Sequence, residues 1–433
     1  MSLLVIASLM LAWTSLGAWC AVRLLHDDFR SLHLPLYFSL GTVLWAYAAF
    51  LWNRLGLLLG PRGIEFGLGV CFVLGLLIRP KANFRKSNLS WMEKLFLGLL
   101  LLAIFVALAQ ALALPMTMWD SIVIYGYKAK ILFYEGTFQT PAFLDPQRLH
   151  LNADYPLLVS YLEASFYHVL GHTDDRVVKL LFWIYWLSFL GVIFAALIES
   201  ARRSLALAVT TMVATLPLFS NDFMGQATAG FVDIPFALYW TGTLLALLRW
   251  RLTVSKADLW TAALLALGCA FTKNEGLALL PIINFVFLFL VPRARRRSLL
   301  LGSFCLLLVL SPWLWTRAHL PHNADHYLGM PENFSLRLIP RLLFVLKMAW
   351  VEVSALSEWG VFWGLLVLAC LSVRGRPMSR ESLLLMGLVF LQAGVYLGSY
   401  LLYDFNVRVL LPVTLLRVMI HLIGPLAIAA GLV

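Results

Sequence analysis

Apolar residues fill runs of membrane-spanning length from one end of the chain to the other, and charged residues lie mainly in the connections. A helix needs about 20 apolar residues to cross the ~30 Å hydrocarbon core of a bilayer. The runs are rich in leucine and lack the period-2 alternation of barrel strands, so the pattern predicts helices. We expect about thirteen spans, near residues 3–24, 34–52, 64–79, 94–114, 178–198, 204–220, 234–249, 258–272, 276–292, 298–316, 359–373, 382–402 and 408–432.

The basic residues between these runs predict the orientation of the chain. They all fall on one side when the spans are placed as above, which is typical of a cytoplasmic face. These residues are Arg79, Lys81, Arg85, Lys86, Lys94, Arg202, Arg203, Arg249, Arg251, Lys256, Arg293, Arg295, Arg296, Arg297, Arg374, Arg376 and Arg380. Two further apolar stretches, 156–170 and 341–356, contain charged residues, and counting either as a span would move basic groups to the other side. We therefore expect both to form helices at or beneath the outer surface.

The composition supports this architecture. With 61% hydrophobic residues, 13% charged residues and a mean hydropathy of +0.86, the chain carries more apolar surface than a soluble protein can bury. The first run lacks a basic leader and a small-residue cleavage site, so we expect it to be a retained span. The predicted fold is an all-α polytopic transmembrane helical bundle.

The net charge bears on the partners of the protein, and the cysteines bear on disulfide bonds and metal sites. The net charge of +11 is concentrated in short connections, where it sets orientation in the membrane, so we expect membrane lipids as partners and no nucleic acid. The five cysteines lie in apolar runs without paired spacing, which favours core packing over a disulfide or a metal site.

Charged and polar residues gather at the span ends opposite the basic side. Polar groups left unpaired near hydrocarbon cost several kcal/mol, so such a concentration predicts a site. The candidates are Asp120, Lys128, Lys130, Asp154, Tyr155, Asp233, Lys273, Glu275, Arg408, Arg417 and His421. Arg417 lies inside the last run, where insertion costs about 2.5–3.5 kcal/mol, so it should face a polar cavity, with His421 one turn later on the same face.

Asp120 opens the largest outer connection and has two interpretations. Pro115 and Trp119 mark the end of a span, and residues 121–135 can form a helix parallel to the membrane. We expect that helix to turn Ile124, Tyr127, Ile131 and Tyr134 toward the lipid. In one interpretation Asp120 is the N-cap, and Lys128 and Lys130 are snorkelling lysines. In the other, Asp120 is a catalytic carboxylate.

Similar alternatives hold for the remaining candidates. Asp233 precedes Pro235 in the pattern of a helix start, and Asp154 precedes Tyr155 and Pro156 in the same way, so either can be an N-cap or a site residue. Lys273 and Glu275 either pair within a turn between two spans or bind a ligand. The spacing of His319, His322 and His326 fits no standard metal site.

Four stretches, in order, resemble one known family. They are "WDSIVIYGYKAKILFYEG", "DYPLLVSYLEASFYHVLG", "GFVDIPFAL" and "TKNEGLALLPI". Together they are similar to the multispanning GT-C glycosyltransferases, in particular the bacterial branch resembling protein O-mannosyltransferases and lipid A aminoarabinose transferases. The resemblance covers roughly residues 94–292, with a weaker echo at "TLLRVMIHLIGP".

The resemblance implies a GT-C-like fold and an inverting hexosyl- or pentosyltransferase. Such an enzyme moves a sugar from a polyprenyl-phosphate carrier to a hydroxyl of a glycan, lipid or protein at the outer membrane face. Asp120 matches the general base of the family, which takes the proton of the acceptor hydroxyl. Lys128, Lys130, Lys273 and either Arg408 or Arg417 would supply cations to the leaving phosphate. No cofactor is implied, and a divalent metal held between acids is the alternative.

The resemblance also divides the chain. Residues 94–316, including an outer loop at 115–179, correspond to the catalytic core, 1–93 to accessory helices, and 317–433 to an outer loop and the last spans. Leu157 stands where the family has a second proline, and the accessory part has no counterpart. Short loops favour a bacterial plasma (inner) membrane with the site facing the periplasm or exterior. A transporter or lipid flippase is the alternative function, because it too places charges among apolar helices, and a non-catalytic membrane scaffold is a third.

Overall fold

The computed structural model describes residues 2–25, 33–78, 88–145, 147–148, 152–220, 225–321, 334–372, 378–402 and 407–432, and within these ranges every regular element is helical. The elements are α1 (Ser2–Trp19), η1 (Cys20–Leu24), α2 (Leu34–Arg54), α3 (Pro61–Leu76), α4 (Trp91–Ala113), η3 (Asp120–Gly126), α5 (Tyr127–Glu135), α6 (Pro141–Leu144), α7 (Leu158–Leu170), α8 (Lys179–Ile198), α9 (Arg203–Ala214), α10 (Pro217–Ser220), α11 (Asp233–Thr253), α12 (Lys256–Thr272), α13 (Asn274–Leu290), α14 (Arg293–His319), α15 (Phe334–Val353), α16 (Leu356–Trp359), α17 (Phe362–Ser372), α18 (Arg380–Leu402) and α19 (Val407–Gly431). The predicted all-α class is confirmed for these residues.

Seven of the helices are long and apolar enough to cross a membrane, which makes a multi-pass membrane protein plausible. These stretches are Ile6–Leu24, Leu34–Arg54, Trp91–Ala113, Lys179–Ile198, Arg293–His319, Arg380–Leu402 and Val407–Gly431. Helices α9 and α13 are apolar but shorter. The run expected at 204–220 is divided into α9 and α10, because Pro217 begins a new helix there. The full set of thirteen spans therefore stays a prediction.

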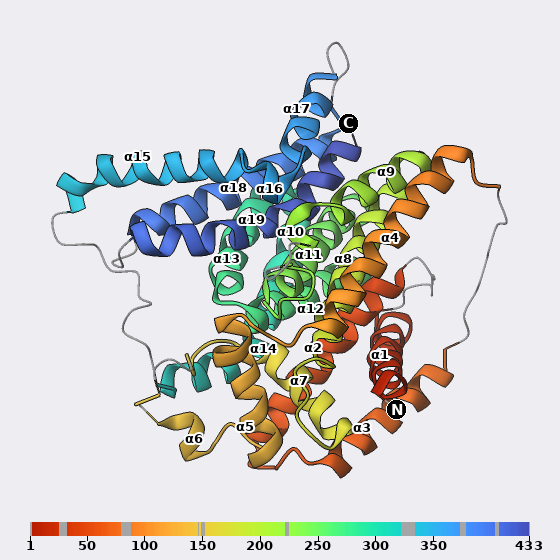
Figure 1. The fold of residues 1–433 in the computed structure, drawn as a ribbon, viewed down its shortest axis with the longest axis vertical. Helices are drawn as coiled ribbons and strands as arrows, with labels where there is room; N and C mark the ends of the chain where they lie inside the picture. The colour runs from red at the N-terminus through yellow and green to blue at the C-terminus, as the bar shows by residue number, and fades with distance from the viewer. Residues whose placement is uncertain are drawn as a thin grey trace.

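Basic residues lie at helix ends on one side of the bundle. Arg203 at the start of α9 binds Glu93 at the start of α4, with Nε 2.7 Å from Oε1. Arg249 near the end of α11 contacts Asp258 of α12 at 3.4 Å and Glu199 after α8 at 4.0 Å. Figure 1 shows α4 and α9 meeting at this end, away from α5, α6 and α7. The expected basic residues Arg79, Lys81, Arg85, Lys86, Arg374 and Arg376 lie outside the described residues.

The N-terminal helices pack into the bundle. Helix α1 lies against α2 and α3, and α2 also contacts α7, α8 and α12. Tyr239 of α11 shares a hydrogen bond of 2.8 Å with Thr42 of α2, which ties this N-terminal part to the centre of the bundle. Figure 1 shows α1 and α2 beside the central helices.

The large connection after α4 folds against the bundle. Helix α7 is buried along almost its whole length, between α2 and α5, as expected for a helix beneath the surface. The expectation that Ile124 and Ile131 face lipid is wrong, because both are buried, at 4% and 6% exposure. Tyr134 is 72% exposed and Tyr127 36%. Packing against α7 therefore determines which face of α5 is covered.

Helix α15 differs from α7 in keeping an open apolar face. Ile339, Leu343, Leu346 and Trp350 are exposed along it at helical spacing. It packs against α18 and α19, beside which it extends in Figure 1. This amphipathic pattern is typical of a helix lying in a membrane interface, and the placement of 341–356 at the outer surface stays a prediction.

Candidate active site

Asp120 is the first residue of the π-helix η3, and its side chain does not cap a helix. The N-cap of η3 is Trp119 and makes no side-chain capping bond, so the N-cap interpretation of Asp120 is wrong. Instead, Nη1 of Arg417 donates a hydrogen bond to Oδ2 of Asp120 at 2.6 Å. Short π-helical segments are rare and occur frequently at functional sites.

Asp233 lies at the centre of the site and accepts from three donors. Nζ of Lys273 lies 2.8 Å from Oδ1, and Nε2 of His421 lies 3.2 Å from the same oxygen. Nε of Arg417 donates to Oδ2 at 2.9 Å. The N-cap of α11 is Val232, so the capping interpretation of Asp233 is also wrong. Asp233 is fully buried, and a carboxylate in that position needs such compensation.

Lys273 and Glu275 complete the network. Lys273 lies between α12 and α13, and its Nζ is 2.8 Å from Oε1 of Glu275 as well as from Asp233. Lys273 therefore pairs with an acid on each side. The side chains of Glu275 and Asp120 are 30% and 24% exposed, whereas Asp233 is closed off. The network thus has a buried centre and an accessible edge.

Close helix packing brings these residues together. A Cβ on Gly424 would lie only 2.4 Å from Oγ1 of Thr241, so a glycine is needed where α19 passes α11. This approach places Arg417 and His421 beside Asp233, which begins α11. The guanidinium of Arg417 also stacks 4.2 Å from the ring centre of Phe231.

A second group of predicted residues lies apart from this network. Lys128 is fully buried, and its Nζ donates to the backbone oxygens of Asn152 at 2.6 Å and Tyr155 at 3.3 Å. Its ammonium also lies 5.7 Å from the Tyr155 ring centre. Burial lowers the pKa of Lys128 to about 7, against the opposing effect of nearby Asp154. Lys128 is therefore neither a snorkelling lysine nor available to a phosphate in this structure.

The remaining candidates have other contacts. Asp154 lies 3.7 Å from Arg317, between its Oδ2 and the arginine Nη2. Lys130 binds Asp175, with 2.9 Å between Nζ and Oδ2. Arg408 is exposed in the first turn of α19, about 13 Å along the helix from Arg417. His322 and His326 lie outside the described residues, and His319 contacts the backbone oxygen of Trp315.

Sequence reasoning missed three residues that continue the network inward. Tyr396 contacts Nδ1 of His421 at 2.8 Å, Gln392 contacts Tyr396, and Trp240 contacts Gln392. Gln392 and Tyr396 are four positions apart on α18 and share a helix face inside an apolar run. That spacing of polar residues was the available signal.

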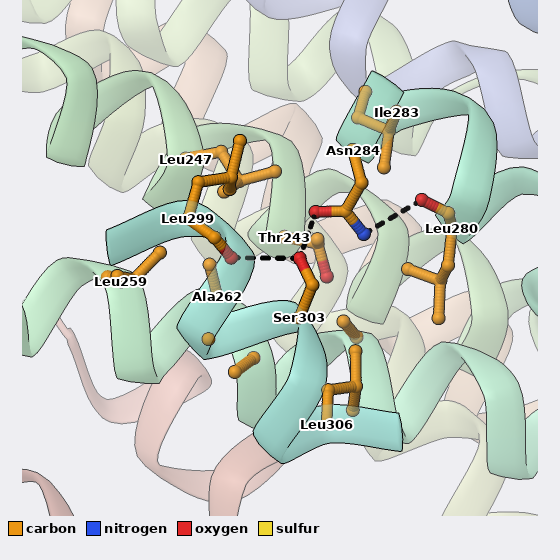
Figure 2. Close-up of a pocket in the computed structure, with 13 residues that line it drawn as sticks. Thr243, Leu247, Leu259, Ala262, Leu280, Ile283, Asn284, Leu299, Ser303 and Leu306 are labelled. Carbon is orange, nitrogen blue, oxygen red and sulfur yellow. Dashed lines mark hydrogen bonds between the residues drawn. The ribbon is translucent and has the colours of Figure 1, made fainter. Parts of the chain in front are cut away.

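A hollow between α11, α12, α13 and α14 contains none of the site residues. It is lined mainly by Leu and Ala side chains (Figure 2). Its polar groups are satisfied, because Asn284 donates to the backbone oxygen of Leu280 at 2.9 Å and contacts Ser303 at 2.8 Å. We assign no chemistry to this hollow.

Neither a group of metal ligands nor a known relative assigns a function to this site. Within the described part of the chain, no group of three or more His, Cys, Asp or Glu residues is arranged to hold a metal ion. No family model, curated protein or solved structure matches the chain. The network of Asp120, Asp233, Lys273, Glu275, Arg417 and His421 is therefore judged on its own geometry.

Proposed function

We propose that the chain is a membrane glycosyltransferase that moves a sugar from a polyprenyl-phosphate carrier to an acceptor hydroxyl. The observation that carries the proposal is the contact of Asp120, a partly exposed carboxylate, with the guanidinium of Arg417. A transferase of this kind needs a carboxylate for the acceptor proton and a cation for the leaving phosphate. The motif resemblance to GT-C enzymes is the second support for this activity.

In the proposed reaction, the acceptor oxygen forms a bond to the anomeric carbon while the bond from that carbon to the phosphate oxygen breaks. The acceptor proton moves to Asp120, and the electron pair of the broken bond leaves on the phosphate. Protonation removes the negative charge of Asp120, so its hold on Nη1 of Arg417 weakens. The freed guanidinium edge can then neutralise the phosphate, while its Nε stays bound to Asp233.

Fewer cations are assigned to the leaving phosphate in this proposal than the sequence analysis suggested. Lys128 and Lys130 already bind backbone oxygens and Asp175, so Arg417 and Lys273 are the cations of the network. We also propose the thirteen-span arrangement in a bacterial inner membrane, with the edge formed by Asp120 and Glu275 facing the periplasm. The basic connections at the opposite end support that orientation.

The activity can be tested directly. The purified protein in lipid nanodiscs is incubated with a panel of undecaprenyl-phosphate-linked hexoses and pentoses, and free undecaprenyl phosphate is measured by mass spectrometry. The proposal predicts release from at least one donor, stimulated by an acceptor with free hydroxyl groups. No release from any donor, together with no saturable binding of undecaprenyl phosphate, would overturn it.

A further inference from the structure

A chain of four buried hydrogen bonds leads from the interior of the bundle to the centre of the site. Nε1 of Trp240 donates to Oε1 of Gln392 at 2.7 Å, and Nε2 of Gln392 lies 2.9 Å from the hydroxyl of Tyr396. That hydroxyl lies 2.8 Å from Nδ1 of His421, whose Nε2 lies 3.2 Å from Asp233. All five side chains are at most 6% exposed, so water does not compete for these bonds.

The number of hydrogens that each group can donate fixes which partner is the donor in each of these hydrogen bonds. The indole N–H of Trp240 can only donate, so the oxygen of the Gln392 amide must face it and the amide nitrogen must face Tyr396. The hydroxyl of Tyr396 then accepts from Gln392 and has its single hydrogen left for Nδ1 of His421. Nδ1 is therefore an acceptor, and the ring hydrogen of His421 is on Nε2, directed at Asp233.

The surroundings of His421 bear on its charge. Oδ1 of Asp233 lies 3.2 Å from Nε2 of the ring, and Asp233 is in turn bound by Lys273 and Arg417. The ring also lies against Phe236, with 4.4 Å between ring centres. A hydrogen on Nδ1 would meet the oxygen of Tyr396, which already accepts from Gln392, and would leave the tyrosine hydrogen without its acceptor. The hydrogen-bond chain therefore opposes protonation of His421.

The two oxygens of Asp233 have separate partners. His421 and Lys273 both donate to Oδ1, which prevents rotation of the carboxylate and leaves Oδ2 for Nε of Arg417. The other edge of that guanidinium reaches Asp120. The position of Arg417 therefore depends on the orientation of Asp233.

We propose that Trp240, Gln392 and Tyr396 are positioning residues that hold His421 as the neutral Nε2–H tautomer and so fix Asp233 for its contact with Arg417. The tautomer follows from the hydrogen bonds alone. That the position of Arg417 affects binding of a phosphate donor rests on the proposed function.

The test is ¹⁵N NMR spectroscopy of histidine-labelled full-length protein in lipid, with the His421 signals identified by their loss in His421→Gln. We expect a neutral ring with the hydrogen on Nε2 throughout about pH 5 to 8, the range in which an unperturbed histidine titrates. An Nδ1–H or doubly protonated ring at neutral pH would overturn the proposal.

Variants separate this role from general structural damage. Tyr396→Phe should let His421 titrate within the same pH range, because Nδ1 becomes free while Asp233 remains. Tyr400→Phe is the matched control on the same helix, since its hydroxyl contacts Thr414 instead, and it should keep the wild-type spectrum. Trp240→Phe is the second variant, and His421 should titrate in it as well, because Gln392 can then turn over, accept the Tyr396 hydrogen and leave the Tyr396 oxygen to accept from Nδ1. Unchanged titration in Tyr396→Phe or in Trp240→Phe would contradict the proposal.

Binding of undecaprenyl phosphate to the same samples keeps the two proposals distinguishable. If the wild-type protein shows the Nε2–H tautomer and the predicted response to Tyr396→Phe but does not bind undecaprenyl phosphate, the positioning role holds and the proposed function fails.

Discussion

Arg417 binds Asp120 at 2.6 Å although the two residues are 297 positions apart in the sequence. The contact joins the connection that follows α4 to a helix near the end of the chain. An arginine inside an apolar helix is costly without a counter-charge. Its two carboxylate partners explain why Arg417 is tolerated at this position of α19.

Substitution of Asp233 should destabilise the protein strongly. In Asp233→Asn, Lys273 and Arg417 lose a shared buried counter-charge, which typically costs about 3–5 kcal/mol. The measurement is the free energy of unfolding in detergent micelles. Asp258→Asn is the control, because its contact with Arg249 is more exposed and such pairs contribute about 0–1 kcal/mol. Equal effects of the two substitutions would show that Asp233 does not hold the network together.

Replacing Arg417 by lysine should weaken phosphate binding. A lysine ammonium cannot present the planar fork with which arginine bridges two carboxylates. Loss of one charge-assisted hydrogen bond, about 1.5–3 kcal/mol, corresponds to about a 10- to 150-fold lower affinity for undecaprenyl phosphate. Arg62→Lys, at an exposed position of α3, serves as the control. An unchanged affinity in Arg417→Lys would remove Arg417 from the proposed phosphate site.

Lys128 should make the free energy of unfolding depend on pH above neutrality. Its pKa is lowered from 10.5 to about 7 by burial, so between these values the unfolded chain binds a proton that the folded protein does not. The free energy of unfolding should therefore rise with pH across this range, by about 1.4 kcal/mol per pH unit from this group. Lys128→Met should lose that contribution to the slope. An equal slope in both proteins would mean that Lys128 is charged in the folded state.

Glu163 should make the free energy of unfolding change with pH in the opposite direction. It is fully buried, neither carboxyl oxygen has a hydrogen-bond partner, and burial raises its pKa well above the usual 4.5. Here the folded protein keeps a proton that the unfolded chain releases, so the free energy of unfolding should fall as pH rises above about 4.5. Glu163→Gln should lose this fall and be the more stable protein at neutral pH. A loss of stability in Glu163→Gln at neutral pH would contradict a protonated Glu163.

The central network was largely predictable because its acids and Lys273 lie at the ends of apolar runs, while Arg417 is a charge inside one. Asp120, Asp233 and Arg417 each require a counter-charge near hydrocarbon, which favours their pairing. The sequence also indicated that Arg417 and His421 share a face of one helix.

The positions of the lysines were not predictable in the same way. Lys128 has the sequence context of an interfacial lysine, and only the packing of α5 against α7 shows that it is buried. The partner of Lys130 is Asp175, which lies beyond α7 in the chain. Likewise, no local pattern connects Trp240 with Gln392, because their contact depends on the packing of helices far apart in sequence. Long-range packing determines all three outcomes.

Turnover and binding measured together in Asp120→Asn test the central claim most directly. The variant keeps the shape of the side chain but cannot take the acceptor proton, so transfer from a polyprenyl-phosphate sugar should fall by about two to four orders of magnitude. Undecaprenyl phosphate should still bind, and Asp145→Asn, at a partly exposed position in the same loop, should retain full activity. A transfer rate in Asp120→Asn equal to that of the wild type would contradict the assignment of Asp120 as the base and, with it, the proposed enzyme.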